Sequence, residues 1–101
     1  MSENLIDLVK IIRDRKNKDV DKSYTSSLLF GGLSLCIDKM EEEFGELKEA
    51  LNAKSNIVYE AADTIYHILV TLEAADIKFE DVLKELENRK KQSGIKEKNN
   101  R

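Results

Sequence analysis

The chain of 101 residues contains no proline and only four glycines. Proline lacks a backbone N–H and clashes with the preceding helical turn, so it is the residue that most effectively ends a helix. Its absence leaves little in this sequence to interrupt helices, and Glu and Lys, which favour helix, dominate the 37% of charged residues. We therefore predict an all-α fold, and the length limits it to one small domain.

Two short helices are expected in the first third of the chain. The first is expected at residues 5–14, where apolar residues recur at helical spacing, and a charged loop follows it. The second is capped by Ser23 or Thr25, whose hydroxyls can accept a hydrogen bond from the first turn. Because each glycine costs roughly 1 kcal/mol inside a helix, the pair Gly31 and Gly32 predicts a kink or break.

The strongest helical patterns lie at residues 33–51 and 57–74. The short polar connection 52–56 makes them antiparallel neighbours. The apolar stripe of the first segment comprises Leu33, Cys36, Ile37, Met40, Phe44, Leu47 and Leu51. The second segment is apolar around most of its circumference, which predicts a buried helix. Its main face comprises Ile57, Ala61, Ile65, Ile68 and Leu72. A last helix is expected after residue 76, with Phe79, Val82, Leu83 and Leu86 on one face.

The net charge of −3 is unevenly distributed. From Arg89 onward the chain carries six basic residues and one acidic residue, or +5, so the remainder carries −8. An acidic body repels nucleic-acid backbones, so no nucleic-acid partner is expected. We expect a folded domain over residues 1–90 and a basic, disordered tail over residues 91–101.

Cysteine usage and the N-terminus bear on the compartment. The single Cys36 cannot form an internal disulfide, and no Cys/His spacing indicates zinc. It is expected to be a small buried residue and not a nucleophile. Charges at Glu3, Asp7 and Lys10 interrupt the N-terminal apolar stretch, so neither a signal peptide nor a membrane span is expected. The pattern predicts a cytoplasmic protein with no membrane partner.

Acidic residues at helical neighbour spacing mark both long segments. Glu43 and Glu46 lie three positions apart, and Glu42 lies four positions before Glu46, a pattern that is common on solvated helices. Glu60 and Asp63 are more informative, because they lie in the narrow polar wedge of a helix predicted to be buried, and buried carboxylates need a partner or a cation. The other residues of this wedge are Thr64, His67 and Thr71.

Two facing acidic strips would require a cation. Like charges about 4 Å apart repel by roughly 1 kcal/mol even in water, and a divalent cation removes that repulsion. Oxygen ligands without thiolates select Mg²⁺ or Mn²⁺ over zinc. A single histidine, His67, makes a di-iron centre less suitable. Because Mg²⁺ neutralises phosphate charge and activates water, the pattern indicates hydrolysis of a polyphosphate.

Five motifs carry a resemblance to a known family. They are IRDRK at 12–16, SYT at 23–25, KMEEEFGE at 39–46, YEAADTIYHILV at 59–70 and DVLKELENR at 81–89. On these motifs the chain resembles the phosphoribosyl-ATP pyrophosphatases of histidine biosynthesis, which belong to the all-α nucleoside triphosphate pyrophosphatase (MazG-like) group. The EExxE…ExxD pattern of that group corresponds to Glu42, Glu43, Glu46, Glu60 and Asp63.

The resemblance implies an antiparallel bundle of four to five helices completed by homodimerisation. It also implies hydrolysis of phosphoribosyl-ATP to phosphoribosyl-AMP and pyrophosphate. The implied metal ligands are Glu43, Glu46, Glu60 and Asp63. Catalytic roles fall to Glu42 and Glu43, with Glu42 as a further ligand or a water-orienting base. The residues expected to contact the nucleotide substrate are Arg13, Arg15, Tyr24, Thr25, Lys39 and His67.

Several of these residues also have structural interpretations. His67 can be a ligand or general base, or a hydrogen-bonded packing residue on the polar wedge. Lys39 can contact a phosphate, or it can form an ion pair with Glu43 one turn further on. Tyr24 and Thr25 can equally cap and pack a helix. The sequence leaves these alternatives open.

Three positions depart from the family pattern. Gly31 stands where the family has a lysine before a glycine, Glu41 stands where a glycine is common, and Cys36 stands where an aliphatic residue is preferred. The missing lysine leaves open a MazG-like (d)NTP pyrophosphatase with the same metal ligands. A third hypothesis is a non-catalytic helical dimer that binds a partner. It predicts that Glu43→Gln or Asp63→Asn raises stability and leaves function unchanged.

Overall fold

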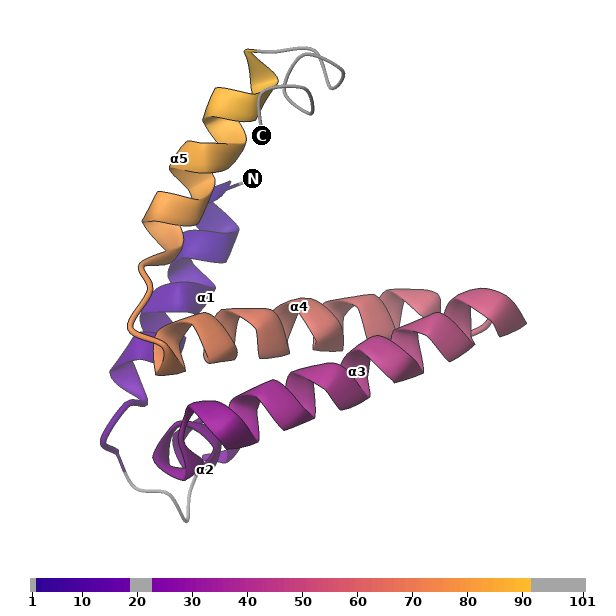
Figure 1. The fold of residues 1–101 in the computed structure, drawn as a ribbon, viewed down its shortest axis with the longest axis horizontal. Coiled ribbons are helices and arrows are strands. Elements are labelled where there is room, and N and C mark those ends of the chain that lie inside the picture. Colours follow the sequence, from indigo (N-terminus) through magenta and orange to yellow (C-terminus); the bar gives the residue numbers. More distant parts are fainter. Residues whose placement is uncertain (1, 19–22, 92–101) are drawn as a thin grey trace.

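The computed structural model describes residues 2–18 and 23–91, which form five α-helices (Figure 1). They are α1 (Ser2–Asp14), α2 (Tyr24–Gly31), α3 (Leu33–Ala53), α4 (Ile57–Ala74) and α5 (Phe79–Lys90). The described residues contain no strand, so the predicted all-α class is confirmed. Apart from its first residue, the predicted basic tail lies outside the described residues.

The helices α3 and α4 form a long antiparallel hairpin, as predicted (Figure 1). The first of them ends because Lys54 adopts a left-handed conformation (φ 56°, ψ 42°), and its N–H donates to the carbonyls of Ala50 and Leu51. The second begins after Asn56, which is also left-handed, at φ 61°. Asparagine tolerates this conformation better than most residues. The turn is therefore tight, and α3 runs slightly further than its sequence pattern indicated.

The short helix α2 has well-defined ends. Ser23 is its N-cap, and the Ser23 Oγ accepts a hydrogen bond from the backbone N–H of Ser26 at 3.2 Å. Gly32 follows its last residue with φ at 91°, a value that residues with a side chain rarely adopt. The break predicted at the glycine pair is confirmed, and it frees α3 to start in a new direction.

The core lies at one end of the hairpin, where α1, α2 and α5 meet it. In Figure 1, α1 and α5 run side by side and cross the C-terminal end of α4. The buried residues of the core are Val9, Ile12, Leu28, Cys36, Leu69, Val70 and Phe79. Cys36 is buried as expected, and its Sγ donates to the Leu28 carbonyl at 3.3 Å.

The predicted apolar stripes are only partly covered. In α3, Phe44 and Leu51 are 46% and 52% exposed, and in α4, Val58 and Ile65 are 84% and 48% exposed. In the single chain, therefore, α4 is not covered on all its apolar sides, and its predicted burial depends on the expected homodimer. The reason is geometric: the other described helices pack against one end of the hairpin and leave the apolar residues nearer its tip open. No helix in the described part of the chain is long and apolar enough to cross a membrane.

Candidate active site

Four carboxylates from the two hairpin helices converge at one point. One carboxylate oxygen from each lies within 4.8 Å of all the others. We call them the carboxylate cluster: Glu43, Glu46, Glu60 and Asp63. Each helix supplies two residues three positions apart, a spacing that places both side chains on one face. The antiparallel turn brings the two faces together. These are the four residues predicted from the sequence to hold a metal.

Four acids of like charge lie together in the carboxylate cluster, and the pKa values of two of them, Glu43 and Glu60, are raised. Loss of water, followed by hydrogen bonding with the carboxyl groups of Asp63 and Glu46 and by their negative charge, raises the pKa of Glu43 to about 8. Loss of water and the charges of Glu46 and Asp63 also raise the pKa of Glu60. Among the described residues, Oε2 of Glu43 and Oε1 of Glu60 are closed to solvent and have no hydrogen-bond partner.

These two orphaned oxygens fit a bound cation. Buried polar atoms in proteins are almost always satisfied, and an exception calls for an explanation such as an ion. Carboxylate oxygens without sulfur ligands suit Mg²⁺ or Mn²⁺. The donor set of the carboxylate cluster therefore matches a hard divalent cation, which would remove both the repulsion and the unsatisfied acceptors.

Two threonines fix the spacing of the helices beside the cluster. Thr64 Oγ1 lies 2.7 Å from the Glu60 carbonyl of its own helix and 3.2 Å from the Glu43 carbonyl of α3, and its hydroxyl donates to them. Two turns later, Thr71 Oγ1 lies 3.2 Å from the Cys36 carbonyl, which accepts from it in the same way. The polar wedge of α4 thus faces α3. Its threonines were seen in the sequence, but their carbonyl partners on α3 could not be identified without the hairpin register.

His67 is a buried, hydrogen-bonded residue at the edge of the cluster. Its Nδ1 lies 2.8 Å from the Asp63 carbonyl oxygen and 3.4 Å from Asp63 Oδ1, and its Nε2 lies 3.1 Å from the Tyr24 hydroxyl. One ring nitrogen also lies within 4.8 Å of carboxylate oxygens of Glu43 and Asp63. The structure therefore places both Tyr24 and His67 beside the carboxylates.

The SYT segment contacts α4 at a second point. The hydroxyls of Thr25 and Tyr66 are hydrogen-bonded to each other. Two consecutive residues of α2 thus contact two consecutive residues of α4, the tyrosine–histidine pair of the YEAAD-x-x-YH motif. The bond between Tyr66 and Thr25 was not predicted from the sequence. The co-occurrence of the SYT and YH motifs was the available signal.

Glu42 and Lys39 lie on the exposed flank of α3. Lys39 Nζ lies 3.3 Å from Glu42 Oε2, so the alternative that paired Lys39 with Glu43 is wrong. The reason is that Glu43 turns inward between the helices, whereas Glu42 points to solvent, with its side chain 63% exposed. Glu42 is not among the four residues that converge in the cluster.

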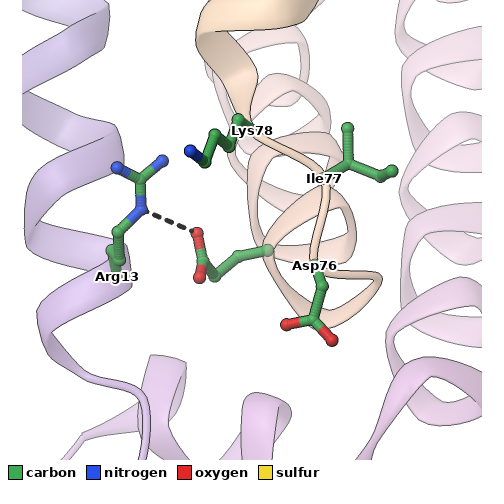
Figure 2. Close-up of a pocket in the computed structure, with 5 residues that line it drawn as sticks. Arg13, Asp76, Ile77 and Lys78 are labelled. Carbon is green, nitrogen blue, oxygen red and sulfur yellow. Dashed lines mark hydrogen bonds and ion pairs between the residues drawn. The ribbon is translucent and has the colours of Figure 1, made fainter.

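Arg13 lies at a different place, in a separate cavity of about 250 Å³ lined by Arg13, Glu73, Asp76, Ile77 and Lys78 (Figure 2). Arg13 Nε lies 3.2 Å from Glu73, and Nη2 lies 3.2 Å from Glu80 of α5. Glu73 is ten residues beyond Asp63 on α4, which is about 15 Å along the helix. The structure therefore does not bring Arg13 to the carboxylate cluster.

Lys16 and Arg15 follow Arg13 and also have structural contacts. Lys16 Nζ lies 2.6 Å from Asp76 and 3.8 Å from Glu73. We call this second group the ion-pair cluster: Arg13, Lys16, Glu73, Asp76 and Glu80. The backbone carbonyl of Arg15 accepts a hydrogen bond from Ser26 Oγ at 2.9 Å, and the residue is exposed. The IRDRK segment thus joins α1 to α2, α4 and α5.

Comparison with known proteins gives one consistent family. A family model described as phosphoribosyl-ATP pyrophosphohydrolase matches residues 5–90. A phosphoribosyl-ATP pyrophosphatase of Rhizobium etli is 42% identical, covering 97% of this chain and 94% of the relative. One of Vesicomyosocius okutanii is 44% identical, covering 100% and 98%. The histidine biosynthesis bifunctional protein HisIE of Helicobacter hepaticus is 48% identical over 96% of this chain and 43% of that protein. No solved structure gave a significant match.

Proposed function

Because the chain belongs to the phosphoribosyl-ATP pyrophosphohydrolase family, we propose that it hydrolyses phosphoribosyl-ATP to phosphoribosyl-AMP and pyrophosphate in histidine biosynthesis. The family relation covers nearly the full length of the chain and of its relatives, which supports a shared activity. A cytoplasmic location is part of this proposal, since the reaction belongs to a biosynthetic route.

The observation that carries the proposal is the pair of orphaned carboxylate oxygens in the carboxylate cluster. Glu43, Glu46, Glu60 and Asp63 would hold Mg²⁺, with Mn²⁺ as a substitute. When bound, the cation supplies neutralisation of phosphate charge and activation of the attacking water. The Thr64 hydroxyl contacts the backbone carbonyls of both Glu43 and Glu60. It would therefore keep α3 and α4 at a fixed separation beside the proposed metal ligands.

The catalytic roles of Glu42 and Glu43 are part of the proposal. Glu43 lies inside the cluster and is the more central of the two. Glu42 lies at the edge with Lys39, so this ion pair would meet the substrate where its phosphates extend from the cluster. We assign contact with a substrate phosphate to Lys39 and orientation of the attacking water to Glu42. The ion pair between them would break when the phosphate binds Lys39.

The remaining substrate contacts divide into two groups. Tyr24 lies beside the cluster and would line the substrate site. The buried His67, expected from the resemblance to contact the substrate, would instead hold Tyr24 in place, and the hydrogen bond between Thr25 and Tyr66 would support both. Arg13 is engaged by Glu73 near the end of α4 and by Glu80 of α5, and a substrate role for Arg13 requires that these ion pairs break. Arg15 is exposed, and its proposed role is contact with a phosphate that extends beyond the cluster.

A homodimer is the proposed assembly. The apolar residues exposed along the hairpin are Leu33, Ile37, Phe44, Leu51, Val58, Tyr59 and Ile65. Large exposed apolar patches on soluble proteins mark interaction sites. A second copy of the hairpin would cover them, as the helical pattern of α4 requires. Size-exclusion chromatography with light scattering tests this point, and a monomer at micromolar concentration would contradict it.

The experiment that tests the activity is a pyrophosphate-release assay on phosphoribosyl-ATP and on a panel of dNTPs, with Mg²⁺ and with chelator. We expect turnover of phosphoribosyl-ATP that stops when chelator is added. Turnover of dNTPs alone would favour the housekeeping pyrophosphatase. Turnover of neither substrate would leave the non-catalytic dimer, and turnover in chelator would exclude the metal mechanism.

A further inference from the structure

The hydrogen-bond partners of His67 determine which ring nitrogen carries the proton of the neutral imidazole. The ring is buried at 3% exposure, and both groups within hydrogen-bonding distance of Nδ1 in the described residues are oxygen atoms of Asp63. The backbone carbonyl, which is the nearer of the two at 2.8 Å, can only accept a hydrogen bond. In the neutral ring, the proton must therefore lie on Nδ1, and Nε2 must carry the lone pair.

This tautomer determines what Tyr24 can do. With Nε2 as an acceptor, the Tyr24 hydroxyl 3.1 Å away has to donate its single proton to it. The phenolic oxygen then has no proton left for another partner and presents lone pairs alone. Burial raises the pKa of Tyr24, Lys39 opposes the rise, and Tyr66, Glu43 and Asp63 add to it, so the hydroxyl lies in the electrostatic field of the carboxylates.

The ring of His67 is also held in orientation. Tyr66 packs edge-on against it with the ring centroids 5.1 Å apart, and Tyr24 packs edge-on at 5.9 Å. The Thr25–Tyr66 bond anchors the second tyrosine to α2. An imidazole with two fixed hydrogen bonds and two aromatic neighbours cannot turn over to offer its other nitrogen.

We propose that His67 is a positioning residue that holds the Tyr24 hydroxyl as a hydrogen-bond acceptor toward the carboxylate cluster. An acceptor at that place selects a group with an O–H bond and rejects a phosphate oxygen. The O–H group comes either from water at the site or from a ribose hydroxyl of the substrate. This inference rests on the proposed hydrolase function, and it gives His67 no direct contact with the substrate.

A double-mutant cycle tests whether His67 acts through Tyr24. Tyr24→Phe and His67→Phe keep the rings and remove the hydrogen bond, and each should lower kcat/KM about tenfold, the effect of one lost hydrogen bond. The double variant should be no worse than His67→Phe alone, because the Tyr24–His67 hydrogen bond is already absent there, and any further loss in His67→Phe comes from its Nδ1 bond to Asp63. Losses that multiply to about a hundredfold, or a Tyr24→Phe variant with unchanged kcat/KM, would overturn the proposal.

His67→Gln provides the rescue variant. Its Oε1 can occupy the place of Nε2 and accept from Tyr24, so it should recover most of the activity lost in His67→Phe. An equal loss in both variants would contradict the positioning role. Tyr59→Phe is the matched control, since it removes an exposed phenolic hydroxyl near the start of α4 and leaves the hydrogen bonds of Tyr24, Thr25 and His67 in place. It should stay within about twofold of the wild type.

Deoxyribose analogues separate the two sources of the O–H group. If Tyr24 accepts from a ribose hydroxyl, Tyr24→Phe should raise KM, and its effect should disappear with the analogue that lacks that hydroxyl. If Tyr24 accepts from water, kcat should fall equally with every substrate. Both results support an acceptor role for the Tyr24 hydroxyl. If Tyr24→Phe instead weakened inhibition by pyrophosphate, the hydroxyl would be binding a phosphate group, and the proposal would be contradicted.

The tautomer can be measured without catalysis. The chain has one histidine, so untagged, ¹⁵N-labelled protein gives a single imidazole in long-range ¹H–¹⁵N spectra. In the neutral ring we expect a protonated Nδ1 and an unprotonated Nε2. A proton on Nε2 would overturn the inference. If the wild type releases no pyrophosphate, the hydrolase proposal fails, while this spectrum still decides the hydrogen-bond geometry.

Discussion

The helix α4 carries two charge clusters about 15 Å apart, and they balance charge in opposite ways. In the ion-pair cluster, Arg13 and Lys16 offset two of the three negative charges, and Arg13 lowers the pKa of Glu80. In the carboxylate cluster, no described cation stands among the four acids, and the pKa of Glu43 rises to about 8. A group that costs the folded chain stability persists when function requires it. The unbalanced cluster is therefore the one for which we propose a bound cation.

The largest difference between the clusters should appear in activity. Asp63→Asn removes a proposed metal ligand and should lower kcat by about 10²- to 10³-fold, the usual cost of losing one charge-stabilising group at an active site. Glu73→Gln, a matched change of one charge in the ion-pair cluster, should leave kcat within about twofold. The measurement is pyrophosphate release in saturating Mg²⁺. A similar loss of kcat in both variants would show that the two clusters do not differ in function.

A smaller but clear difference should appear in metal-dependent stability. Mg²⁺ at a hundred times its dissociation constant adds about 2.7 kcal/mol to the folded state. For a domain of this size, that raises Tm by about 10 °C or more. Glu43→Gln should raise Tm in chelator, because it relieves repulsion, and should reduce the Mg²⁺ response. Thermal unfolding with a Mg²⁺ titration checks both, and a wild-type Tm that ignores Mg²⁺ would contradict the metal proposal.

The pH dependence of the metal-free protein should follow Glu43. Because its folded pKa of about 8 lies above the ordinary value of 4.5, its stabilising contribution is complete below about pH 4.5 and is lost as the pH rises toward 8. The loss should be on the order of 1–2 kcal/mol, since water still screens part of this half-buried side chain.

Thermal unfolding in chelator between pH 5 and about pH 8 measures this loss. We expect Tm to fall across that range in the wild type and to stay nearly flat in Glu43→Gln. A wild-type slope that persists unchanged in the variant would show that another group controls it.

The smallest effect is expected in the ion-pair cluster. Glu73 has a side chain 12% exposed and two cationic neighbours, so Glu73→Gln should destabilise the fold by about 1 kcal/mol, or about 4–8 °C in Tm. The lowered pKa of Glu80 gives this cluster the opposite pH response, with stability lost as the pH falls below about 4.5. Chemical denaturation at pH 4 and pH 7 measures both. An unchanged free energy of unfolding in Glu73→Gln would show that its ion pairs contribute nothing.

The sequence predicted the features that depend on local spacing. The start of α4, the capping role of Ser23 and the break at Gly32 follow from residues within one or two turns of each other. The convergence of Glu43 with Asp63 was also predictable, because a short connection forces the two helices to pair.

What the sequence did not reveal depends on partners far apart in the chain. Arg13 bonds to Glu73, which lies 60 positions away in the sequence. No periodicity of the sequence shows whether Arg13 pairs with a carboxylate of the protein or with a phosphate of the substrate. The same holds for Tyr24 and His67, which are 43 positions apart. Which apolar residues of α4 stay exposed in the single chain, such as Ile65, also depends on where the distant helices pack, and the sequence does not show this.

The tight turn at Lys54 and Asn56 has a consequence for how the protein folds. All four carboxylates lie within one helical hairpin, so they meet through contacts of short sequence separation. Such contacts form quickly, because little loop entropy opposes them. The ion-pair cluster, by contrast, needs α1 to find the end of α4 across most of the chain. The acidic site therefore belongs to the local unit of the folding reaction, and its mutual repulsion acts on the folding chain before the distant helices arrive.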